Sequence, residues 1–277
     1  DGSINIYNNN KVSTKYYGKK FHNAGIRDFL FEENGDWWAV SYEGALKVSK
    51  EKSMLYNIDN GLPANELRRI FKDSRGQIWL GSRVAGLIKF NQNDNKNHTV
   101  YDKTNGLSSN YIFSIEEDNK GNIIIGTNAG GLSILNEKGD IKTFHIKDDD
   151  SGILIFNTFI DENNVIFACT NIGLFAFKEG VFKIIELSGN QELQTFFDLI
   201  YDEMGGYWLT SNNGVVKIKK DQTNEFLKGK LGLIETEVFD QEDGMVNNEC
   251  TGATKSYFDT IDKKIWVPTF SGAAVID

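Results

Sequence analysis

Proline, cysteine and long apolar runs are scarce in this chain of 277 residues. Only 2 prolines stand against 27 glycines, so the turns are built mostly with glycine. No stretch approaches the ~18 consecutive apolar residues of a membrane-spanning helix. Lys and Arg number 30 against 39 Asp and Glu, and the net charge of −9 argues against a nucleic-acid partner. With 40% hydrophobic residues the chain is able to bury a core, which excludes disorder.

The residue types of metal and nucleophile sites are also few. Cys169 and Cys250 leave one disulfide possible, but two separate buried thiols are favoured because Cys is among the most buried residue types. None of the three histidines pairs with a Ser or Cys in a nucleophile motif, and no Cys/His spacing fits zinc. We therefore predict no catalytic residue, no metal and no cofactor.

One phrase recurs along the chain. An acidic residue is followed by glycine, an apolar strand that often holds Trp, a small polar residue, and a second glycine that opens another apolar strand; the clearest copies are 73–87 and 118–132. The central residues of six copies are spaced by 41, 45, 43, 41 and 58 positions, and they are Trp38, Trp79, Ile124, Phe167, Trp208 and Trp266. We expect these Trp side chains in the core rather than stacked on a ligand.

Each copy reads as four short strands, with an Asp-x-x-Gly turn between the first two. The turn needs a residue that tolerates positive φ, and its Asp is expected to cap its own backbone. Four antiparallel strands at a ~40–45-residue period are typical of a β-propeller blade. We predict an all-β propeller of six four-stranded antiparallel blades, with seven blades as the alternative, in a single domain that spans 1–277.

The two ends of the chain look complementary. The last copy stops at Asp277 after its third strand, and Gly2–Tyr7 reads as an outer strand without a blade. Pairing them would close the ring and remove exposed sheet edges. The long interval before Trp266 is interpreted as an insertion around 223–235, with a helical turn within 222–231, and not as a seventh blade. A start at Asp1, without Met or signal peptide, suggests a processed chain or a piece of a larger protein.

A second phrase joins the copies: Asn60-Gly61-Leu62-Pro-Ala-Asn65, Asn105-Gly106-Leu107-Ser-Ser-Asn110 and Asp243-Gly244-Met245-Val-Asn-Asn248. Together with Asp-x-x-Gly-x-Ile-Trp-Leu-Gly-Ser/Thr, it resembles the two-component-regulator propeller repeat. That repeat occurs in extracytoplasmic sensor regions of bacterial hybrid histidine kinases and some diguanylate cyclases. The stretch Trp266–Asp277 is similar to the last blade of the family. The resemblance covers essentially the whole chain, closely in two copies and loosely in three.

The resemblance implies a ligand-sensing module and not an enzyme. It implies a periplasmic location within a membrane-anchored signalling protein, and a polysaccharide fragment or other small molecule as ligand. A second propeller and a β-sandwich of the same polypeptide are implied as partners, together with a possible homodimer. The kinase or cyclase output would lie outside this sequence, and no membrane contact by this part is expected.

One position of the first strands is polar in every copy amid apolar neighbours. We name these residues the polar column: Asp28, Arg69, Ser114, Asn157, Asp198 and Ser256. Because the innermost strands of a propeller surround its central channel, the column is predicted to line a hydrated channel. The alternative is that it forms the floor of a ligand site.

The loops after the second strands and the loops between blades emerge on one face. They carry the candidate ligand-binding residues Tyr42, Asn65, Arg68, Arg83, Asn110, Tyr111, Asn128, Asn212 and Asn248. Such groups suit a polyhydroxylated or acidic sugar, with Asn for hydroxyls, Tyr for a ring face and Arg for a carboxylate or sulfate. Tyr42, Arg68 and Arg83 do not recur with the repeat and are the stronger candidates. The recurring Asn has the alternative role of tying its own loop.

Two other functions stay open. A protein-interaction scaffold or dimerisation propeller would show an exposed apolar patch. A propeller lyase or glycosidase would need converging carboxylates and a base, which cannot be assembled from this sequence. The net charge mildly disfavours a simple polyanion as ligand.

Overall fold

The computed structural model describes residues 3–8, 11–17, 25–50, 52–92, 94, 96–148, 152–189 and 195–277. The chain separates into two compact units. Unit 1 comprises residues 1–105 and 110–112, and unit 2 comprises residues 106–109 and 113–277. Strands dominate both units, and none of the helices in the described ranges is long and apolar enough to span a membrane.

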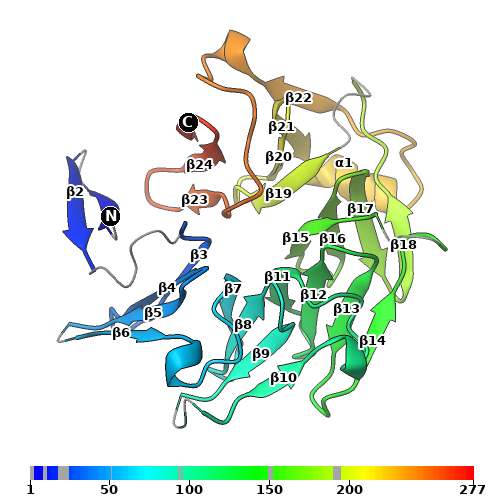
Figure 1. Cartoon of the computed structure of the whole chain (residues 1–277). Coiled ribbons are helices and arrows are strands. Elements are labelled where there is room, and N and C mark those ends of the chain that lie inside the picture. Colours follow the sequence, from blue (N-terminus) through cyan, green and yellow to red (C-terminus); the bar gives the residue numbers. More distant parts are fainter. Residues whose placement is uncertain are drawn as a thin grey trace. The chain divides into compact units, whose positions relative to one another are not determined.

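Unit 1 holds two four-stranded antiparallel sheets (Figure 1). The first sheet runs in the order β3 (Asp28–Phe31), β4 (Trp37–Ser41), β5 (Gly44–Val48) and β6 (Ser53–Tyr56). The second sheet runs in the order β7 (Leu67–Lys72), β8 (Ile78–Ser82), β9 (Leu87–Phe90) and β10 (Thr99–Tyr101). Their facing sides form one buried core in which Trp38, Ile70 and Phe90 pack together.

Unit 2 continues the same plan. Its first two sheets consist of β11 (Ile112–Glu117, whose first residue belongs to unit 1), β12 (Ile123–Thr127), β13 (Leu132–Leu135) and β14 (Ile141–Phe144), then β15 (Ile155–Ile160), β16 (Ile166–Thr170), β17 (Gly173–Lys178) and β18 (Val181–Ile184). The next two consist of β19 (Phe196–Tyr201), β20 (Gly206–Ser211), β21 (Gly214–Lys219) and β22 (Thr236–Phe239), then β23 (Tyr257–Asp259), β24 (Lys264–Thr269) and β25 (Gly272–Ile276). Buried clusters again fill the space between consecutive sheets.

The fold is an all-β, six-bladed propeller with four-stranded antiparallel blades, as predicted. The long interval before Trp266 contains the α-helix α1 (Lys220–Leu227) and the outer strand β22, so it is an insertion and not a seventh blade. Trp38, Trp79 and Trp208 are buried, as expected, whereas Trp266 is half-buried. Cys169 and Cys250 are separate buried thiols. The assignment of 1–277 to a single domain stays a prediction.

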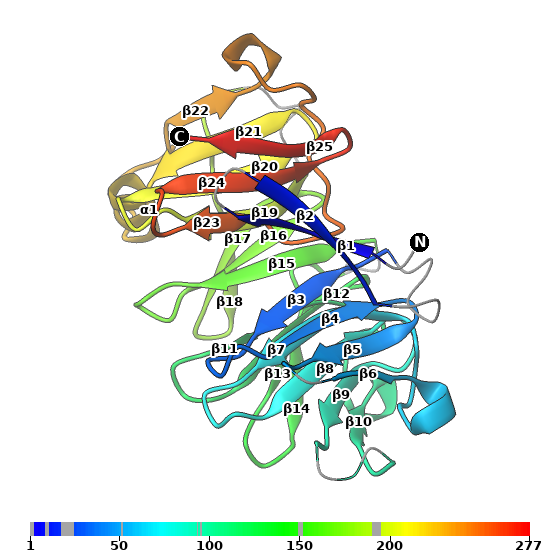
Figure 2. The same cartoon turned by 90° about the vertical axis from the view of Figure 1, so that its left-hand side faces the viewer.

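The N-terminal strand differs from the prediction. β1 (Ser3–Asn8) pairs with β2 (Lys11–Tyr16) in a two-stranded sheet (Figure 2), and the last sheet of the described chain has three strands. Pairing with the last blade was therefore the wrong assignment for this strand. The segment that follows it carries β-branched Val12 and Thr14, and a hairpin between neighbours in sequence needs only a short loop, whose closure costs little entropy.

The turn acid explains why Asp and Trp occur together in the repeat. In the second blade, Asp73 Oδ1 accepts hydrogen bonds from the backbone N–H groups of Arg75 (3.1 Å) and Gln77 (2.8 Å). Its Oδ2 accepts the indole N–H of Trp79 at 2.9 Å. Asp202 makes the equivalent bonds in the fifth blade, including that from Trp208 at 2.9 Å. The carboxylate thus holds the turn with one oxygen and orients the core Trp with the other.

Blades without Trp replace the indole donor with an amide. Asp118 Oδ2 accepts from the side-chain amide of Asn122 at 2.9 Å, in the blade whose central residue is Ile124. In the fourth blade Asn164 takes a φ of 58° at the place of the turn glycine, as its tolerance of positive φ predicts. The turn is therefore kept while its partners vary.

Candidate binding site

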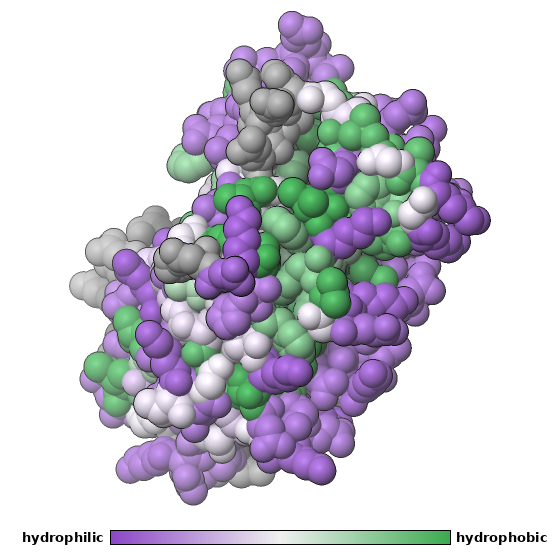
Figure 3. Space-filling model, turned by 90° about the vertical axis from the view of Figure 1, so that its right-hand side faces the viewer, coloured by the Kyte–Doolittle hydropathy of each residue, from purple (hydrophilic) through white to green (hydrophobic). Residues whose placement is uncertain are grey.

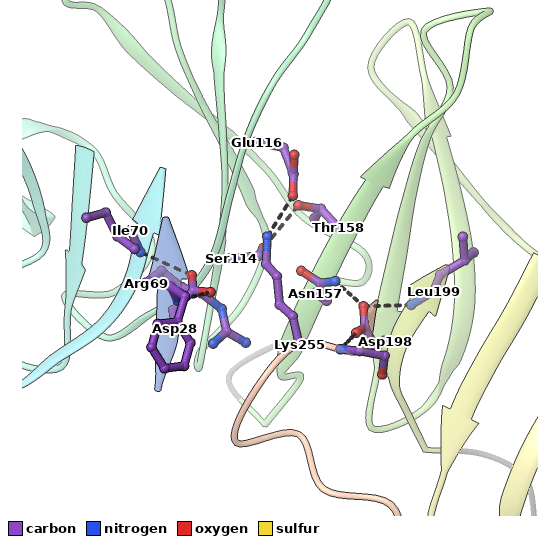
Figure 4. Close-up of polar contacts among 12 residues, drawn as sticks. Asp28, Arg69, Ile70, Ser114, Glu116, Asn157, Thr158, Asp198, Leu199 and Lys255 are labelled. Carbon is purple, nitrogen blue, oxygen red and sulfur yellow. Dashed lines mark hydrogen bonds and ion pairs between the residues drawn. The ribbon is translucent and has the colours of Figure 1, made fainter. Parts of the chain in front are cut away.

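The polar column lies on the inner strands, as the repeat alignment predicts. Equivalent backbone pairings hold four of its members: Asp28 faces Val40, Arg69 faces Gly81, Asn157 faces Cys169 and Asp198 faces Thr210. Five of the six side chains are buried, and Ser256 is half-buried. Figure 4 shows their polar contacts. Their role in lining a channel stays a prediction.

In unit 2, hydrogen bonds join three members of the polar column, Asn157, Asp198 and Ser256. Asp198 accepts the side-chain amide of Asn157, the Leu199 N–H (2.9 Å) and the Ser256 N–H (2.6 Å). Ser114 accepts the hydroxyl of the neighbouring Thr158 at 3.1 Å. The carboxylate is therefore compensated by three donors.

A cavity of about 310 Å³ lies against this network in unit 2. Asn157, Asp198 and Ser256 line it, together with the ion pair between Lys255 Nζ and Glu116 Oε1 at 3.0 Å. Asn157 Oδ1 and Ser256 Oγ have no hydrogen-bond partner among the described residues. A buried polar group of this kind is usually satisfied by water or by a ligand hydroxyl.

In unit 1 the column carries charge. Asp28 accepts the backbone N–H groups of Phe29 (3.0 Å) and Ile70 (3.2 Å). Arg69, which is 2% exposed, donates through Nη1 to the carbonyl oxygens of Arg68 (3.3 Å) and Arg27 (3.5 Å). Both contacts of this guanidinium are long and end on neutral acceptors.

A second set of residues precedes the polar column by one position. The strand pairing slips by one residue at Arg68, Phe156 and Phe197, so each forms a β-bulge on its inner strand. A bulge inserts an extra residue and re-aims its side chain. We name this set the bulge column; by sequence equivalence it comprises Arg27, Arg68, Phe113, Phe156, Phe197 and Lys255.

The bulge column differs between the units. In unit 2, Phe113 stacks on Phe156 with ring centroids 5.6 Å apart, and Phe156 meets Phe197 edge-on at 5.2 Å. In unit 1 both members are arginines, Arg27 and Arg68. The same backbone feature therefore presents aromatic rings in one unit and positive charge in the other.

The arginines of unit 1 meet two tyrosines that come from loops. Arg27 Cζ lies 4.5 Å from the ring centroid of Tyr42, and Arg68 Cζ lies 5.8 Å from that of Tyr111. Arg83 lies between the two rings, at 5.9 Å and 5.6 Å. We name this group, together with the adjacent guanidinium of the polar column, the Arg–Tyr cluster: Arg27, Tyr42, Arg68, Arg69, Arg83 and Tyr111.

Four of the nine candidate ligand-binding residues meet in this cluster: Tyr42, Arg68, Arg83 and Tyr111. Arg83 reaches it because Gly86, at φ 87°, turns the loop where a Cβ would collide with the Tyr101 carbonyl oxygen. Its Nη1 also pairs with Glu66 Oε2 at 3.2 Å. Arg27 was not among the predicted residues, although its place before Asp28 matches the place of Arg68 before Arg69.

The electrostatics of the cluster are dominated by positive charge. Burial, and after it the neighbouring charge of Arg69, lowers the pKa of Arg68 to about 10. Burial raises the pKa of the Tyr111 phenol, which is hydrogen-bonded to Tyr42. Arg68 stays protonated at neutral pH, so the cluster holds like charges together.

The recurring asparagines tie their loops. Asn65 Oδ1 accepts the Ile58 N–H at 2.8 Å, and Asn110 Oδ1 accepts the Lys103 N–H at 2.9 Å. These bonds match the structural alternative for the Gly-Leu-x-x-Asn phrase. Their part in ligand binding stays a prediction.

The three remaining candidates belong to unit 2. Asn128 accepts the Ser109 hydroxyl at 2.7 Å, and Asn212 is exposed. Asn248 Oδ1 is buried without a hydrogen-bond partner among the described residues. No contact of these residues with one another is seen in the described ranges.

The described part of the chain contains no cluster of histidines or of metal-ligating side chains. His98 stacks on Phe90 with centroids 4.9 Å apart and accepts the Asn91 N–H at 3.0 Å, whereas His22 lies outside the described residues. Within those residues, no group of three or more His, Cys, Asp or Glu side chains is placed to hold a metal ion.

The fold and its repeated blades define the chain as a six-bladed β-propeller built from one kind of repeat. Residues 61–83 and 106–129 match the family model described as two component regulator propeller. The chain thus carries the repeat of that family, and the resemblance seen in the sequence is confirmed. A comparison with curated proteins finds no match.

Solved structures with the same fold belong to several kinds of protein. The extracellular domain assigned to the hybrid two component system BT3049 from B. thetaiotaomicron has a TM-score of 0.76 at 19% identity, and the match covers 100% of this chain and 36% of that one. This chain thus spans about a third of that domain's length. A catalytically inactive virginiamycin B lyase from Staphylococcus aureus, with quinupristin, has a TM-score of 0.69 at 12% identity, covering 97% of this chain and 81% of that one. At these identities the likeness shows the fold.

Proposed function

We propose that the chain is the ligand-sensing, extracytoplasmic module of a bacterial two-component or related signalling receptor, and that it responds to a carbohydrate. The observation that carries the proposal is the Arg–Tyr cluster. Loops and inner strands far apart in sequence bring Tyr42, Arg83 and Tyr111 within ring-contact distance. The family match and the propellers of extracellular two-component domains support the signalling role.

The chemistry of the cluster suits a sugar. Tyrosine rings present an apolar face that a pyranose ring can cover, and their hydroxyls offer hydrogen bonds at its edge. Guanidinium groups bind ring hydroxyls or acidic substituents with fixed geometry. We assign no catalytic role to these residues, and the signalling output would lie elsewhere in the polypeptide.

The test is calorimetric titration of the full chain with a panel of neutral and acidic oligosaccharides. At least one oligosaccharide should bind, and Tyr42→Ala should weaken its binding about 10-fold, because an aromatic contact contributes about 1–1.5 kcal/mol. Tyr16→Ala is the matched control, since Tyr16 lies in the same unit on β2 and is 59% exposed. Equal losses in both variants, or no binding by any oligosaccharide, would contradict the proposal.

An enzymatic role is separated by analysing the ligand after incubation. Mass spectrometry should recover the bound oligosaccharide at its original mass. A shortened or unsaturated product would instead place the chain with propeller lyases or glycosidases.

A protein-interaction role is the second candidate. Apolar side chains gather near the middle of the face seen in Figure 3, surrounded by hydrophilic ones. On the outer strand β18, Val181 and Ile184 are 67% and 43% exposed. Light scattering that finds a stable dimer, combined with no binding to any oligosaccharide, would favour this role over sensing.

A further inference from the structure

Unit 1 gathers more positive charge than its carboxylates balance. Arg68 and Arg69 are 6% and 2% exposed, and Arg27 is half-buried beside them. Glu66 is already paired with the exposed Arg83. In the described part of the chain, no carboxylate forms an ion pair with Arg27 or Arg69. Unit 1 holds 16 Lys and Arg against 12 Asp and Glu, although the protein as a whole carries −9, so positive charge is concentrated in this unit.

Asp28 does not resolve the imbalance. It is the only acidic member of the polar column in unit 1, and it lies next to the backbone of Arg69 in Figure 4. Its two oxygens already accept the backbone N–H groups of Phe29 and Ile70. Asp28 therefore supplies no ion pair to Arg27 or Arg69 among the described residues.

Two donors in this group, one on Arg27 and one on Arg69, have no acceptor among the described residues. Both are Nε–H groups, and both are buried. Arg69 Nη1 donates two long hydrogen bonds to carbonyl oxygens, at 3.3 Å and 3.5 Å. A buried donor without an acceptor is destabilising, so natural proteins rarely keep one unless a ligand or water satisfies it.

We propose that Arg27, Arg68 and Arg69 form a subsite for one oxyanion, a carboxylate or sulfate group carried by the ligand. Planar guanidinium groups match the paired oxygens of such an anion and bind it through charge-assisted hydrogen bonds. The rings of Tyr42 and Tyr111, which pack against Arg27 and Arg68, would then hold the body of the ligand beside its anionic group. The inference rests on the proposed function for the sugar, but the anion site can be tested without it.

The bulge explains how the subsite is built. In a regular strand, consecutive side chains point to opposite faces of the sheet. The extra residue at position 68 interrupts this alternation between Arg68 and Arg69. Two adjacent positions thereby contribute to one site. The electrostatic consequence is visible in Arg68, whose pKa of about 10 reflects burial first and then the charge of Arg69.

The experiment compares matched ligands on the full chain by calorimetry. A trigalacturonate is set against its carboxyl-reduced form, and a sulfated disaccharide against its desulfated form; inorganic sulfate is titrated alone. The variants are Arg69→Met, which removes the charge, and Arg69→Lys, which keeps it but loses the planar fork. The matched control is Arg75→Met, because Arg75 lies in the same unit, is 44% exposed and pairs with Asp73 at 3.6 Å.

We expect an acidic ligand to bind more tightly than its neutral counterpart. Arg69→Met should weaken the acidic ligand about 30-fold, the effect of losing charge-assisted hydrogen bonds, and leave a neutral ligand unchanged. Arg69→Lys should lose about 10-fold, and Arg75→Met less than 2-fold. Inorganic sulfate should raise the melting temperature of the wild type more than that of Arg69→Met, because an anion that binds the folded state stabilises it.

The outcomes separate the two proposals. Neutral sugars that bind as tightly as acidic ones, with no effect of either Arg69 variant, would overturn the oxyanion subsite and keep the carbohydrate sensor. Sulfate binding that depends on Arg69, with no sugar bound, would support the subsite and overturn the sensor. Equal losses in Arg69→Met and Arg75→Met would show general charge attraction and overturn the subsite.

Discussion

The two units share one arrangement of strands but carry different side chains on their inner strands. In unit 2 the Asp198 carboxylate accepts three hydrogen bonds, from the Asn157 amide and from the Leu199 and Ser256 N–H groups. In unit 1 the column and its neighbour bring together Arg68 and Arg69, whose charges repel. Hydrogen bonds to a buried carboxylate stabilise a fold, whereas like charges that are buried side by side destabilise it. The comparison favours a structural role for Asp198 in unit 2 and agrees with the binding role that we propose for the arginines of unit 1.

The largest expected effect is on the network of unit 2. Asp198→Ala should lower the free energy of unfolding by about 3–4 kcal/mol, because it leaves three buried donors without an acceptor. Urea denaturation followed by circular dichroism measures the change. Asp198→Asn, which keeps one acceptor oxygen, should lose less. A loss below 1 kcal/mol for the alanine variant would contradict the structural role of Asp198 in unit 2.

The turn acids should behave alike in both units. Asp73 in unit 1 and Asp202 in unit 2 each accept two backbone N–H groups and one indole N–H. Replacing either with Ala should cost about 2–3 kcal/mol, since a buried Trp donor loses its partner. Denaturation curves of the two variants should agree within about 1 kcal/mol, within the spread of such measurements. A clear difference would show that the turn acid does not contribute equally to the stability of the two units.

The buried arginine of unit 1 should contribute little to stability. Arg69→Met should change the free energy of unfolding by less than about 1 kcal/mol, because an uncompensated buried charge is replaced by an apolar side chain of similar length. The same urea titration gives the value. A loss as large as that of Asp198→Ala would mean that Arg69 is structural, and the contrast between the units would disappear.

The smallest effect is on thiol reactivity, which reports on unit 2 alone because both cysteines lie there. Burial raises the pKa of Cys250 to about 11 and that of Cys169 well above its ordinary value. At pH 8 the thiolate fraction is small, so a disulfide reagent should label neither thiol of the native chain on the time scale that labels both in denaturant. Asp198→Ala should speed labelling by opening unit 2, and Arg69→Met should not. Equal acceleration by both variants would argue against separate roles.

The repeat made most of the fold predictable. Spacing, turn glycines and the alternation of short apolar segments define the blades, and the polar column follows from aligning Asp28, Arg69 and their equivalents. The N-terminal hairpin could not be predicted in this way, because Ser3–Tyr16 lies outside the repeat and its pairing depends on local sequence.

The candidate site was predictable only in part. Tyr42, Arg68 and Arg83 stood out because they do not recur, and the structure brings them together with Tyr111. The β-bulge could not be predicted, because the two-residue alternation of side chains along a strand does not reveal an extra residue. Arg27 was not predicted either, because its role in the Arg–Tyr cluster depends on the side chain that the bulge presents at position 68.

The bulge has an evolutionary consequence. Its residue is surplus to the hydrogen-bond ladder, so the pairing of the inner strand with its neighbour continues on either side whatever side chain the position carries. Arginine at position 68 and phenylalanine at positions 156 and 197 occupy it with the same register. Single substitutions there can replace a charge with a ring, or a ring with a charge, without rebuilding a blade. Related propellers can therefore diverge in what they recognise through a handful of positions while their blades stay the same.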